Sequence, residues 1–487
     1  MSEPRRLSVP TMISFGVGEA SGAFANTTWG VLLLFYYQQV VGVEAAMVGL
    51  AIAISVMLDA VSDPLVGTWS DQLTTRWGRR HPLLVASALP LAVSFVLLFT
   101  PPAGMTDLQG FLWLMTFGIL TRFFYTFYNI PHLALGAEMA QDYYQRSTLF
   151  AYSSFVGAMS VAVVYGLITG LFFPTTPEFD PGFLNAAAYP FMSICFASVM
   201  VAAILICAIG TRGEIAHLRK TQIRPRIGLF TVFTEMRAVF GNLSFRAIFF
   251  GLVLGSLVGG VESAFMPFMG IHFWGFRTED LFYLTFVGLF GFPVAFVLIP
   301  FLTRVLDKRM AVMLPLASWI IAVNTPICLR LLDVSWFPDN SSAWILPIFL
   351  AASTVGALAS PIIGATTNSM LADVADEHEL ESGVRREGVL YSVRAFTSKA
   401  TAAFGTLFGG ILLSWIEFPA HAVRGEIDSS TIWSLGLIAG PATSIFSLAA
   451  LGFYFMYRIN HKRHLEIVEQ LSSRRRDLAV GATETVG

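Results

Sequence analysis

Charged residues are scarce in this sequence. Only 13% of its 487 residues are Asp, Glu, Lys or Arg, whereas soluble globular proteins contain about 25%. The formal net charge of −2 argues against a nucleic-acid partner, because proteins that bind nucleic acids are usually strongly basic. Cysteine is also rare. Cys195, Cys207 and Cys328 all fall inside apolar segments, which predicts small buried residues and argues against a disulfide or metal framework.

The motifs of common enzymes are missing as well. The sequence has no phosphate-binding glycine loop, no cluster of metal ligands and no nucleophile that can be paired with a base. We therefore expect a protein that is not an enzyme and that needs no cofactor.

Apolar residues are abundant instead and make up 55% of the chain. Apolar stretches of about 20 residues recur, and each is long enough to cross a hydrocarbon core about 30 Å thick. Aromatic residues such as Phe35, Tyr36, Tyr37, Trp274 and Trp344 are expected mostly at lipid-facing or interfacial positions. The sequence predicts an all-α polytopic membrane protein with twelve spans, at 12–41, 46–70, 81–101, 108–138, 148–173, 188–211, 243–272, 280–304, 311–333, 343–371, 389–416 and 432–457.

Basic residues gather at one alternating set of span ends. The other set has little beyond Arg277 and Arg424. By the positive-inside rule, both termini are predicted to be cytoplasmic, in a protein of the cell inner membrane. The basic set consists of Arg5, Arg6, Arg76, Arg79, Arg80, Arg146, Arg212, Arg219, Lys220, Arg224, Arg226, Lys308, Arg309, Arg385, Arg386, Lys462, Arg463, Arg474, Arg475 and Arg476.

The chain also contains a weak internal repeat. The segment AEMAQDYYQRSTLFAYS (137–153) is echoed by ADVADEHELESGVRREGVLYS (372–392), and DPLVGTWSD (63–71) aligns with IPFLTRVLD (299–307). Such duplication predicts two pseudo-symmetric six-helix bundles with a binding site between them near the middle of the membrane. The bundles are predicted at 1–211 and 243–458, with a cytoplasmic linker at 212–242 and a basic amphipathic tail at 459–487 that lies along the membrane surface.

Two carboxylates occur in the second predicted span. Asp59 and Asp63 are four residues apart and therefore lie one turn apart on the same helix face. Each would cost about 2.5–3.5 kcal/mol at the bilayer centre, so we expect both to face a cavity or a partner. Neighbouring carboxylates attract a shared proton or a hard cation, and Ser62 and Thr126 are predicted to complete an oxygen cage. A pair neutralised by structural salt bridges is the alternative.

These charges are not duplicated in the repeat. Asp59 and Asp63 align with Ala295 and Ile299, and Lys399 of the eleventh span aligns with Ser160. A buried lysine needs a nearby carboxylate to keep its proton. We expect Lys399 to bind the aspartates when the cation is absent and to be released when the cation enters, which couples the cation to conformation. A lysine that extends to the membrane surface is the alternative.

Further polar side chains in the spans are candidates for a substrate site. Arg122, Thr126 and Asn129 follow one face of the fourth span, and a bridge from Arg122 to Glu19 or Asp59 is expected. His132 is expected to be packed or solvated, not a proton relay. The candidate substrate-binding residues are Glu19, Arg122, Tyr125, Asn129, Glu262 and Arg394, and the candidate stacking platforms are Trp113, Tyr125 and Tyr128.

Charged residues at the basic span ends predict a gate. Guanidinium groups there can bind carboxylates across the molecule, in a latch that is closed in one conformation and broken in another. A solvated signal for membrane topology is the alternative. The candidate gate residues are Asp71, Arg76, Arg79, Arg80, Glu138, Asp142, Arg146, Asp373 and Asp376.

Three of these motifs together resemble a known family. SDPLVGTWSDQLTTRWGRRHP (62–82), YNIPHLALGAEMAQDYYQRS (128–147) and ADVADEHELESGVRREGVLYSVRAFTSKATAAFG (372–405) are similar to segments of the glycoside-pentoside-hexuronide:cation symporters of the major facilitator superfamily. The resemblance covers most of the chain. It implies the major facilitator fold, cation-binding aspartates at Asp59 and Asp63, the helix-four threonine at Thr126 and the helix-eleven lysine at Lys399.

The sugar-binding positions differ from those of the melibiose carriers in this family. Ala23 and Asn129 stand where those carriers have substrate-binding aspartates. Three more positions differ, with Leu133 for a tryptophan, Ser154 for a basic residue and Arg394 for a glutamine. Galactoside recognition is therefore not inherited. The loss of two acids and the gain of Arg122 and Arg394 favour an anionic substrate, such as a uronide or glucuronide.

We therefore predict a monomeric symporter that uses Na⁺ or H⁺ to import a glycoside-like small-molecule solute by alternating access, with no metal beyond Na⁺ at Asp59 and Asp63. A carrier of lysophospholipids or other amphiphiles is an alternative that requires a lateral opening to lipid. A membrane sensor or scaffold that does not transport is an alternative of another class. A scaffold is disfavoured because it has no need for buried charges at the middle of the membrane.

Overall fold

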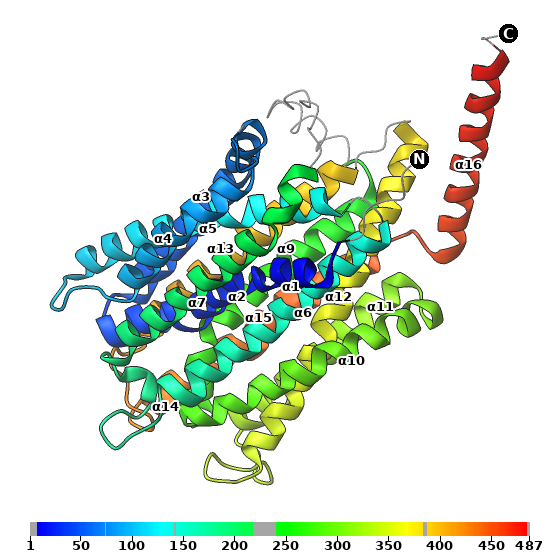
Figure 1. Ribbon diagram of the computed structural model, residues 1–487. Helices are drawn as coiled ribbons and strands as arrows, with labels where there is room; N and C mark the ends of the chain where they lie inside the picture. Colours follow the sequence, from blue (N-terminus) through cyan, green and yellow to red (C-terminus); the bar gives the residue numbers. More distant parts are fainter. Residues whose placement is uncertain (1–6, 74, 141–142, 218–239, 383–386, 485–487) are drawn as a thin grey trace.

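The structure is a computed structural model that describes residues 7–73, 75–140, 143–217, 240–382 and 387–484, where all regular elements are helices (Figure 1). We call the helices before residues 218–239 the first half: α1 (Val9–Val17), α2 (Glu19–Phe35), η1 (Tyr36–Val41), α3 (Ala45–Gln72), α4 (His81–Leu98), α5 (Asp107–Met139), α6 (Tyr143–Leu167), η2 (Ile168–Phe172), η3 (Gly182–Leu184), α7 (Ala188–Gly210) and η4 (Arg212–His217). The second half comprises α9 (Leu243–Phe268), η5 (Met269–Phe273), η6 (Thr278–Phe282), α10 (Tyr283–Val305), α11 (Lys308–Leu331), α12 (Ile345–Ser382), α13 (Glu387–Trp415), α14 (Ser429–Leu437), η7 (Ile438–Ala442) and α15 (Thr443–Phe455). The chain then continues into α16 (His461–Glu484).

Eleven helical stretches in the described ranges are long and apolar enough to cross a membrane. The first predicted span is helical too, but it is divided at Gly18 into α1 of 9 residues and α2 of 17 residues. With this divided helix included, the described chain has a helix at each predicted span, which confirms the all-α polytopic architecture. The largest difference is α12, which has 38 residues and ends at Ser382. The predicted end at 371 was too early because ADVADEHELE contains good helix formers and no helix breaker.

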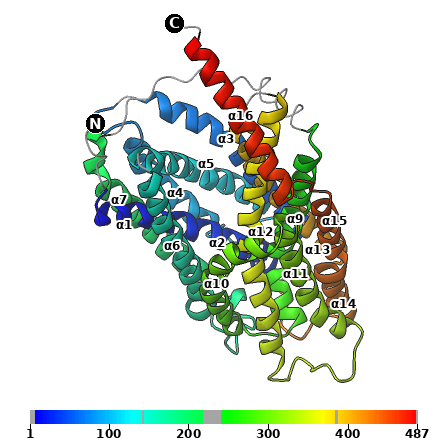
Figure 2. The same ribbon diagram turned by 90° about the vertical axis from the view of Figure 1, so that its right-hand side faces the viewer.

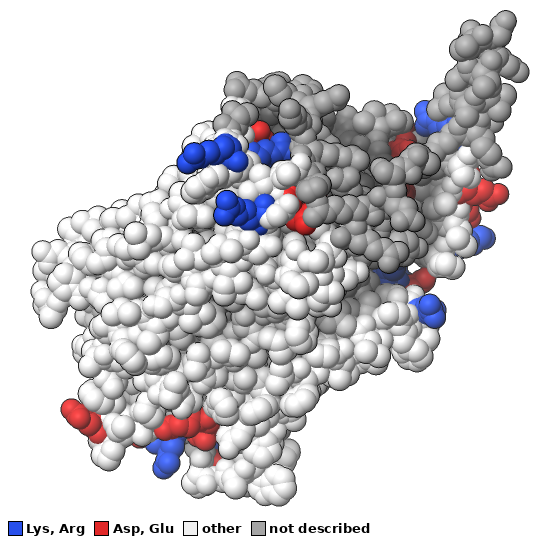
Figure 3. All heavy atoms as spheres, in the orientation of Figure 1, with Lys and Arg blue, Asp and Glu red and all other residues white. Residues whose placement is uncertain are grey.

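The start of α1 and helix α16 lie toward the same end of the molecule (Figures 1 and 2). We call this end, at which the basic set of span ends lies, the basic end, and we call the other the opposite end. On the face drawn in Figure 3, charged side chains are confined to the two ends, and a wide band between them carries none. Such a band is typical of a surface in contact with lipid hydrocarbon.

Small residues bring the two halves into close contact. Helix α3 packs along α13, and α2 packs on α9. A Cβ atom at Gly49 would lie only 3.1 Å from the Cα atom of Leu407. Such packing is a common basis of helix association in membranes, because lipid is as apolar as the side chains it would replace. The α3–α13 contact places Asp59 and Asp63 beside Lys399.

Aromatic residues of the first span were predicted to lie at the lipid surface, but the structure buries them in the protein. Tyr36 and Tyr37 are 5% and 0% exposed. The Tyr36 hydroxyl donates to the carbonyl of Phe99 and the Tyr37 hydroxyl to that of Leu98, at 3.2 and 2.7 Å. Phe35 and Trp274 are buried as well, whereas Trp344 is exposed. Because the protein interior and the lipid are both apolar, hydropathy alone does not separate these two environments.

Helix α16 also differs from the predicted membrane-surface segment. It extends away from the bundle at the basic end (Figure 1). Its apolar residues Ile467 and Leu471 are buried in a core with Leu371 of α12, and Arg463 Nε lies 3.9 Å from Glu377 Oε1. Part of the apolar face of α16 therefore packs against the protein, while Leu465 and Val468 of the same helix are exposed.

Candidate functional site

Four side chains from three helices meet where α3 crosses α13. Lys399 Nζ of α13 lies 3.2 Å from Asp59 Oδ2 and 2.5 Å from Asp63 Oδ2, both on α3. The Thr126 hydroxyl of α5 lies 2.5 Å from Asp59 Oδ1 and 3.1 Å from Asp63 Oδ1. The structure thus brings together the two aspartates, the threonine and the lysine that the sequence singled out. We call Asp59, Asp63, Thr126 and Lys399 the acidic cluster.

Charge in the acidic cluster is not balanced. Two carboxylates face one ammonium group, so the fully ionised cluster carries one excess negative charge. The Asp59 side chain is only 3% exposed, while those of Asp63 and Lys399 are 20% and 38% exposed. Excess charge in a buried, poorly solvated place favours the uptake of a proton or a cation. Partial exposure of Asp63 and Lys399 leaves a route by which either ion can arrive.

The hydroxyl of Ser62 is used differently from the prediction. It donates to the backbone carbonyl of Asp59 in its own helix, at 3.0 Å, instead of facing the carboxylates. Another oxygen atom near the carboxylates was not predicted from the sequence, namely the backbone carbonyl oxygen of Ala60. Pro64 lies inside α3 and has no N–H, so the carbonyl of Ala60 lacks its usual helical donor. This carbonyl is an additional acceptor one residue from Asp59.

Arg122 does not form the predicted bridge to Glu19 or Asp59. Its Nη1 donates to Asn26 Oδ1 at 2.7 Å, and its guanidinium lies over the Trp29 ring, 4.3 Å from the centroid. Its buried Nε has no hydrogen-bond acceptor among the described residues. Asn26 and Trp29 were missed in the sequence. Their spacing could have identified them, since Asn26 follows Glu19 by two helical turns and therefore lies on the same face of the first span.

Glu19 is bound by other partners. Ser153 Oγ donates to Glu19 Oε1 at 2.9 Å, and His132 Nε2 lies 3.4 Å from the same oxygen. The His132 ring stacks on Phe15 with a centroid distance of 4.2 Å, so it is packed as expected. A Cβ atom at Gly18 would lie 2.8 Å from the His132 ring. The glycine that divides the first span therefore lets His132 approach Glu19.

The remaining substrate candidates are spread over both halves. A Cβ atom at Gly22 would lie 2.6 Å from the Tyr125 hydroxyl, which places Tyr125 between α5 and α2, and Asn129 is half-buried one turn further on. Glu262 of α9 is half-buried in the second half. Arg394 of α13 lies near Tyr454, and its Nε lacks an acceptor in the same ranges.

Two of the three predicted stacking platforms do not present a free ring to a solute in this conformation. Tyr128 is only 1% exposed within the first-half core. Trp113 donates from Nε1 to the carbonyl of Leu97 at 2.8 Å and borders the loop at 102–105. Tyr125 lies near both Arg122 and Glu19, whereas Tyr128 stacks on His132 with a centroid distance of 5.3 Å and so lies on the Glu19 side of the site.

Five of the nine gate candidates at the basic end form ion pairs within one half or the other. Glu138 Oε1 lies 3.0 Å from Arg79 Nη2 and 2.7 Å from Arg80 Nη2, and Arg80 also contacts Asp71. In the second half, Asp373 binds Lys308 at 2.7 Å. These pairs fix the ends of neighbouring helices in one half. They do not join the halves in this conformation.

Four gate candidates remain. Arg146 donates to the carbonyl of Ala137 at 2.8 Å. Arg76 is exposed, 5.9 Å from the centroid of the neighbouring Trp77 ring. Asp376 lies on α12 one turn after Asp373, and Asp142 falls outside the described residues.

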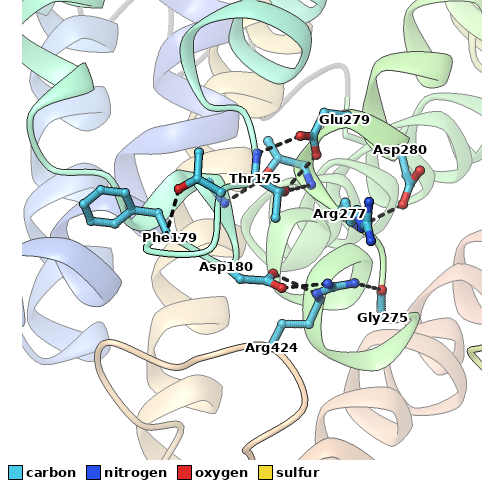
Figure 4. A network of polar contacts seen from close by, with 11 residues as sticks. Thr175, Phe179, Asp180, Gly275, Arg277, Glu279, Asp280 and Arg424 are labelled. Carbon is cyan, nitrogen blue, oxygen red and sulfur yellow. Dashed lines mark hydrogen bonds and ion pairs between the residues drawn. The ribbon is translucent and has the colours of Figure 1, made fainter.

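At the opposite end, polar contacts join the halves directly (Figure 4). Arg424 donates to both oxygens of Asp180, at 2.8 and 2.7 Å, and to the carbonyl of Gly275 at 2.8 Å. This hydrogen bonding to Asp180 raises the pKa of Arg424 above its ordinary value. The loop before α7 is thereby bound to two loops of the second half.

Two neighbouring contacts reinforce this connection. Glu279 accepts hydrogen bonds from the backbone N–H and the hydroxyl of Thr175, at 2.7 and 2.8 Å. Gln39 donates to the carbonyl of Pro419 at 2.7 Å and accepts from the N–H of Ala422 at 2.8 Å. We call these contacts, together with Asp180–Arg424, the opposite-end clasp. Its sequence signal was the presence of Arg424 among span ends that otherwise contain few basic residues.

Comparison with known proteins agrees with this architecture. The MFS/sugar transport protein family matches residues 14–461. The chain is 24% identical to the uncharacterised symporter YjmB of Bacillus subtilis over 472 residues, and this alignment covers 96% of each chain. It is also 24% identical to the glucuronide carrier protein homolog of Escherichia coli, over 97% of each chain.

A solved structure shows the same fold. A bacterial homolog of the human lysosomal transporter Spinster, in an inward-facing and unoccupied conformation, superposes with a TM-score of 0.63 at 13% identity, over 94% of this chain and 97% of that one. The chain therefore belongs to the MFS/sugar transport protein family, as its resemblance to the glycoside-pentoside-hexuronide:cation symporters predicted, and it is a multi-pass membrane transporter and not an enzyme.

Proposed function

We propose that the protein is a cation-coupled symporter that imports a glycoside-like solute by alternating access. The coupling ion is Na⁺ or H⁺, and the favoured solute is an acidic sugar such as a glucuronide. The single observation that carries the proposal is the acidic cluster, in which Lys399 of one half binds Asp59 and Asp63 of the other.

Competition between Lys399 and the cation provides the coupling. With Lys399 bound, an ammonium group partly neutralises the carboxylates and ties α13 to α3. An arriving proton or Na⁺ takes the place of that charge and frees the lysine, which removes a contact between the halves. Because the cation then favours one conformation over another, its gradient can drive the transition that carries the solute.

The opposite-end clasp indicates that this conformation is closed at the opposite end. Asp180–Arg424 and Thr175–Glu279 join the halves at that end, while the ion pairs of Glu138 and Asp373 lie within the separate halves at the basic end. We infer a conformation that opens at the basic end. The positive-inside rule assigns the basic end, and with it both termini, to the cytoplasm of the inner membrane. The acidic cluster is complete within one chain, which supports a transporter that acts as a monomer.

Two incompletely bound guanidinium groups favour an anionic solute. Arg122 and Arg394 each keep a buried Nε–H without an acceptor among the described residues. Buried donors are normally paired, which supports a carboxylate of the solute as the acceptor in a conformation that exposes these groups. The glucuronide carrier homolog of E. coli, a relative over nearly the whole chain, supports the same class of solute.

The test uses purified protein in proteoliposomes. An inward Na⁺ gradient, an H⁺ gradient and no gradient are imposed in turn, with a radiolabelled glucuronide, a neutral glycoside or a lysophospholipid outside. We expect uphill accumulation of the glucuronide under only one gradient. Accumulation that is the same without any gradient contradicts symport. Binding without accumulation of any solute identifies a sensor or scaffold, and accumulation of the lysophospholipid alone identifies an amphiphile carrier.

A further inference from the structure

A cavity lies at the basic end of the second half, away from the acidic cluster. It has a volume of about 590 Å³, and its wall includes Asp307, Arg309, Phe455, Met456 and Arg458. These residues come from the N-cap and first turn of α11, from the last residue of α15 and from the segment that joins α15 to α16. The cavity is not explained by the transport mechanism.

The position of the cavity corresponds to the boundary of the membrane. Lys308 is the first residue of one candidate span, and Phe455 is the last residue of another. The cavity therefore lies at the level where hydrocarbon gives way to lipid headgroups. This placement depends only on where the two spans end, and it holds whichever side of the membrane the basic end faces.

The wall of the cavity is amphiphilic. Phe455 and Met456 are 61% and 44% exposed and present an apolar surface. The guanidinium of Arg309 lies 5.1 Å from the centroid of the Phe455 ring, and its Nη1 donates to the carbonyl of Phe455 at 3.4 Å. This arrangement holds a positive charge directly above an exposed aromatic ring. An acyl chain can lie against the ring while a phosphate binds the guanidinium.

The net charge of the wall is positive. Arg458 is exposed and contributes the second guanidinium. The carboxylate of Asp307 accepts a hydrogen bond from the backbone N–H of His461 at 3.3 Å, so this oxygen is already bound at the first turn of α16. Two guanidinium groups against one engaged carboxylate leave an excess positive charge, which complements a headgroup with a single negative charge.

We propose that this cavity binds an anionic phospholipid, with the phosphate at Arg309 and Arg458 and an acyl chain along Phe455 and Met456. Free phosphate and phosphate esters share the headgroup chemistry, but they do not use the exposed apolar wall. The apolar wall is therefore the reason to assign a lipid. The site is independent of the proposed transport activity.

The experiment measures binding to the full-length protein in an uncharged detergent. The probes are short-chain phosphatidylglycerol, short-chain phosphatidylcholine and glycerol phosphate, and native mass spectrometry and thermal denaturation are the readouts. We expect phosphatidylglycerol to bind about tenfold more tightly than the other two probes. The double variant Arg309→Gln/Arg458→Gln is expected to lose this preference, whereas Arg212→Gln, an exposed arginine of the first half, keeps it.

Several outcomes overturn the proposal. These are an unchanged phosphatidylglycerol affinity in the double variant, an equal loss in Arg212→Gln, and binding of glycerol phosphate as tight as that of the lipid. If the double variant does not fold, Arg458→Gln alone decides the matter, because that side chain is exposed. It is expected to weaken phosphatidylglycerol binding about threefold, and no change in its affinity refutes the site.

Discussion

Lys399 Nζ and Asp63 Oδ2 lie 2.5 Å apart although they belong to different halves of the chain and are separated by 336 residues. This ion pair is therefore also a mechanical connection between α13 and α3. Any ion that neutralises Asp63 weakens the connection, and any conformation that separates the helices exposes a carboxylate to the ion. Ion binding and conformation are thus linked in both directions, as thermodynamic coupling requires.

Replacement of Asp63 by asparagine is expected to abolish the dependence of transport on the cation gradient. The amide keeps the size of the side chain but removes the charge that attracts the cation. Gradient-driven accumulation in proteoliposomes should fall at least about tenfold, while exchange of solute across the membrane without a gradient persists. The matched control is Glu178→Gln, an exposed acid at the opposite end, which should accumulate solute like the unchanged protein. Full coupling in Asp63→Asn refutes the ion site.

Lys399→Ala is expected to tighten cation binding and impair coupling at the same time. Without the ammonium group, Asp59 and Asp63 repel each other, and a proton or Na⁺ relieves this repulsion more strongly than before. The midpoint of Na⁺ or H⁺ titration, followed by thermal denaturation, should shift to lower cation concentration, while gradient-driven accumulation decreases. Lys462→Ala on the exposed start of α16 is the control. Unchanged titration together with unchanged accumulation removes Lys399 from the mechanism.

The spans and the acidic cluster were accessible to sequence reasoning for physical reasons. Membrane insertion requires long apolar stretches, so the helices are encoded locally. The charges of Asp59, Asp63 and Lys399 are costly in a membrane, so each needed a partner. The failure of the internal repeat at these positions indicated that the first half supplied the acids and the second half the base. The proximity of these groups in the structure agrees with that reasoning.

The partner of Arg122 was not accessible in the same way. Glu19 and Asp59 were reasonable acceptors by charge, but Glu19 is bound by Ser153 and His132. Asp59 is bound by Thr126 and Lys399. Which acceptor remains for an arginine depends on how every competing group is placed, and sequence spacing does not contain that information. The opposite-end clasp was missed for a similar reason, because it depends on how loops of the two halves meet.

Arg122→Gln and Arg394→Gln are expected to discriminate between charged and neutral solutes. Each removes a guanidinium whose Nε–H has no acceptor in the described part of the chain. The apparent affinity for a glucuronide should fall about tenfold, while that for the corresponding neutral glucoside changes little. Uptake competition in proteoliposomes measures both affinities. Arg246→Gln, an exposed arginine of α9, is the control. An equal loss for both solutes contradicts the anionic assignment.

Arg424→Ala is expected to shift the protein toward a conformation that is open at the opposite end. The change removes two hydrogen bonds to Asp180 and one to Gly275. The Arg424 and Asp180 side chains are 24% and 33% exposed, so solvent screening limits the loss to about 1 kcal/mol, or about a fivefold change in population. Asp180 raises the pKa of Arg424 above its ordinary value, so the arginine stays charged beyond the pH at which a free arginine would lose its proton. The shift should therefore not vary with pH near neutrality.

The population of the open conformation can be measured directly. Spin labels introduced through unnatural amino acids at the exposed positions Glu178 and Glu426 report the distance between the halves at the opposite end. Arg424→Ala should increase the long-distance population about fivefold relative to the unchanged protein. Arg277→Ala, an exposed arginine of the same end, should leave the distribution unaltered. If both variants give the distribution of the unchanged protein, the pairing of Arg424 with Asp180 does not hold the halves together. The closed end must then depend on Thr175–Glu279 and on the contacts of Gln39 instead.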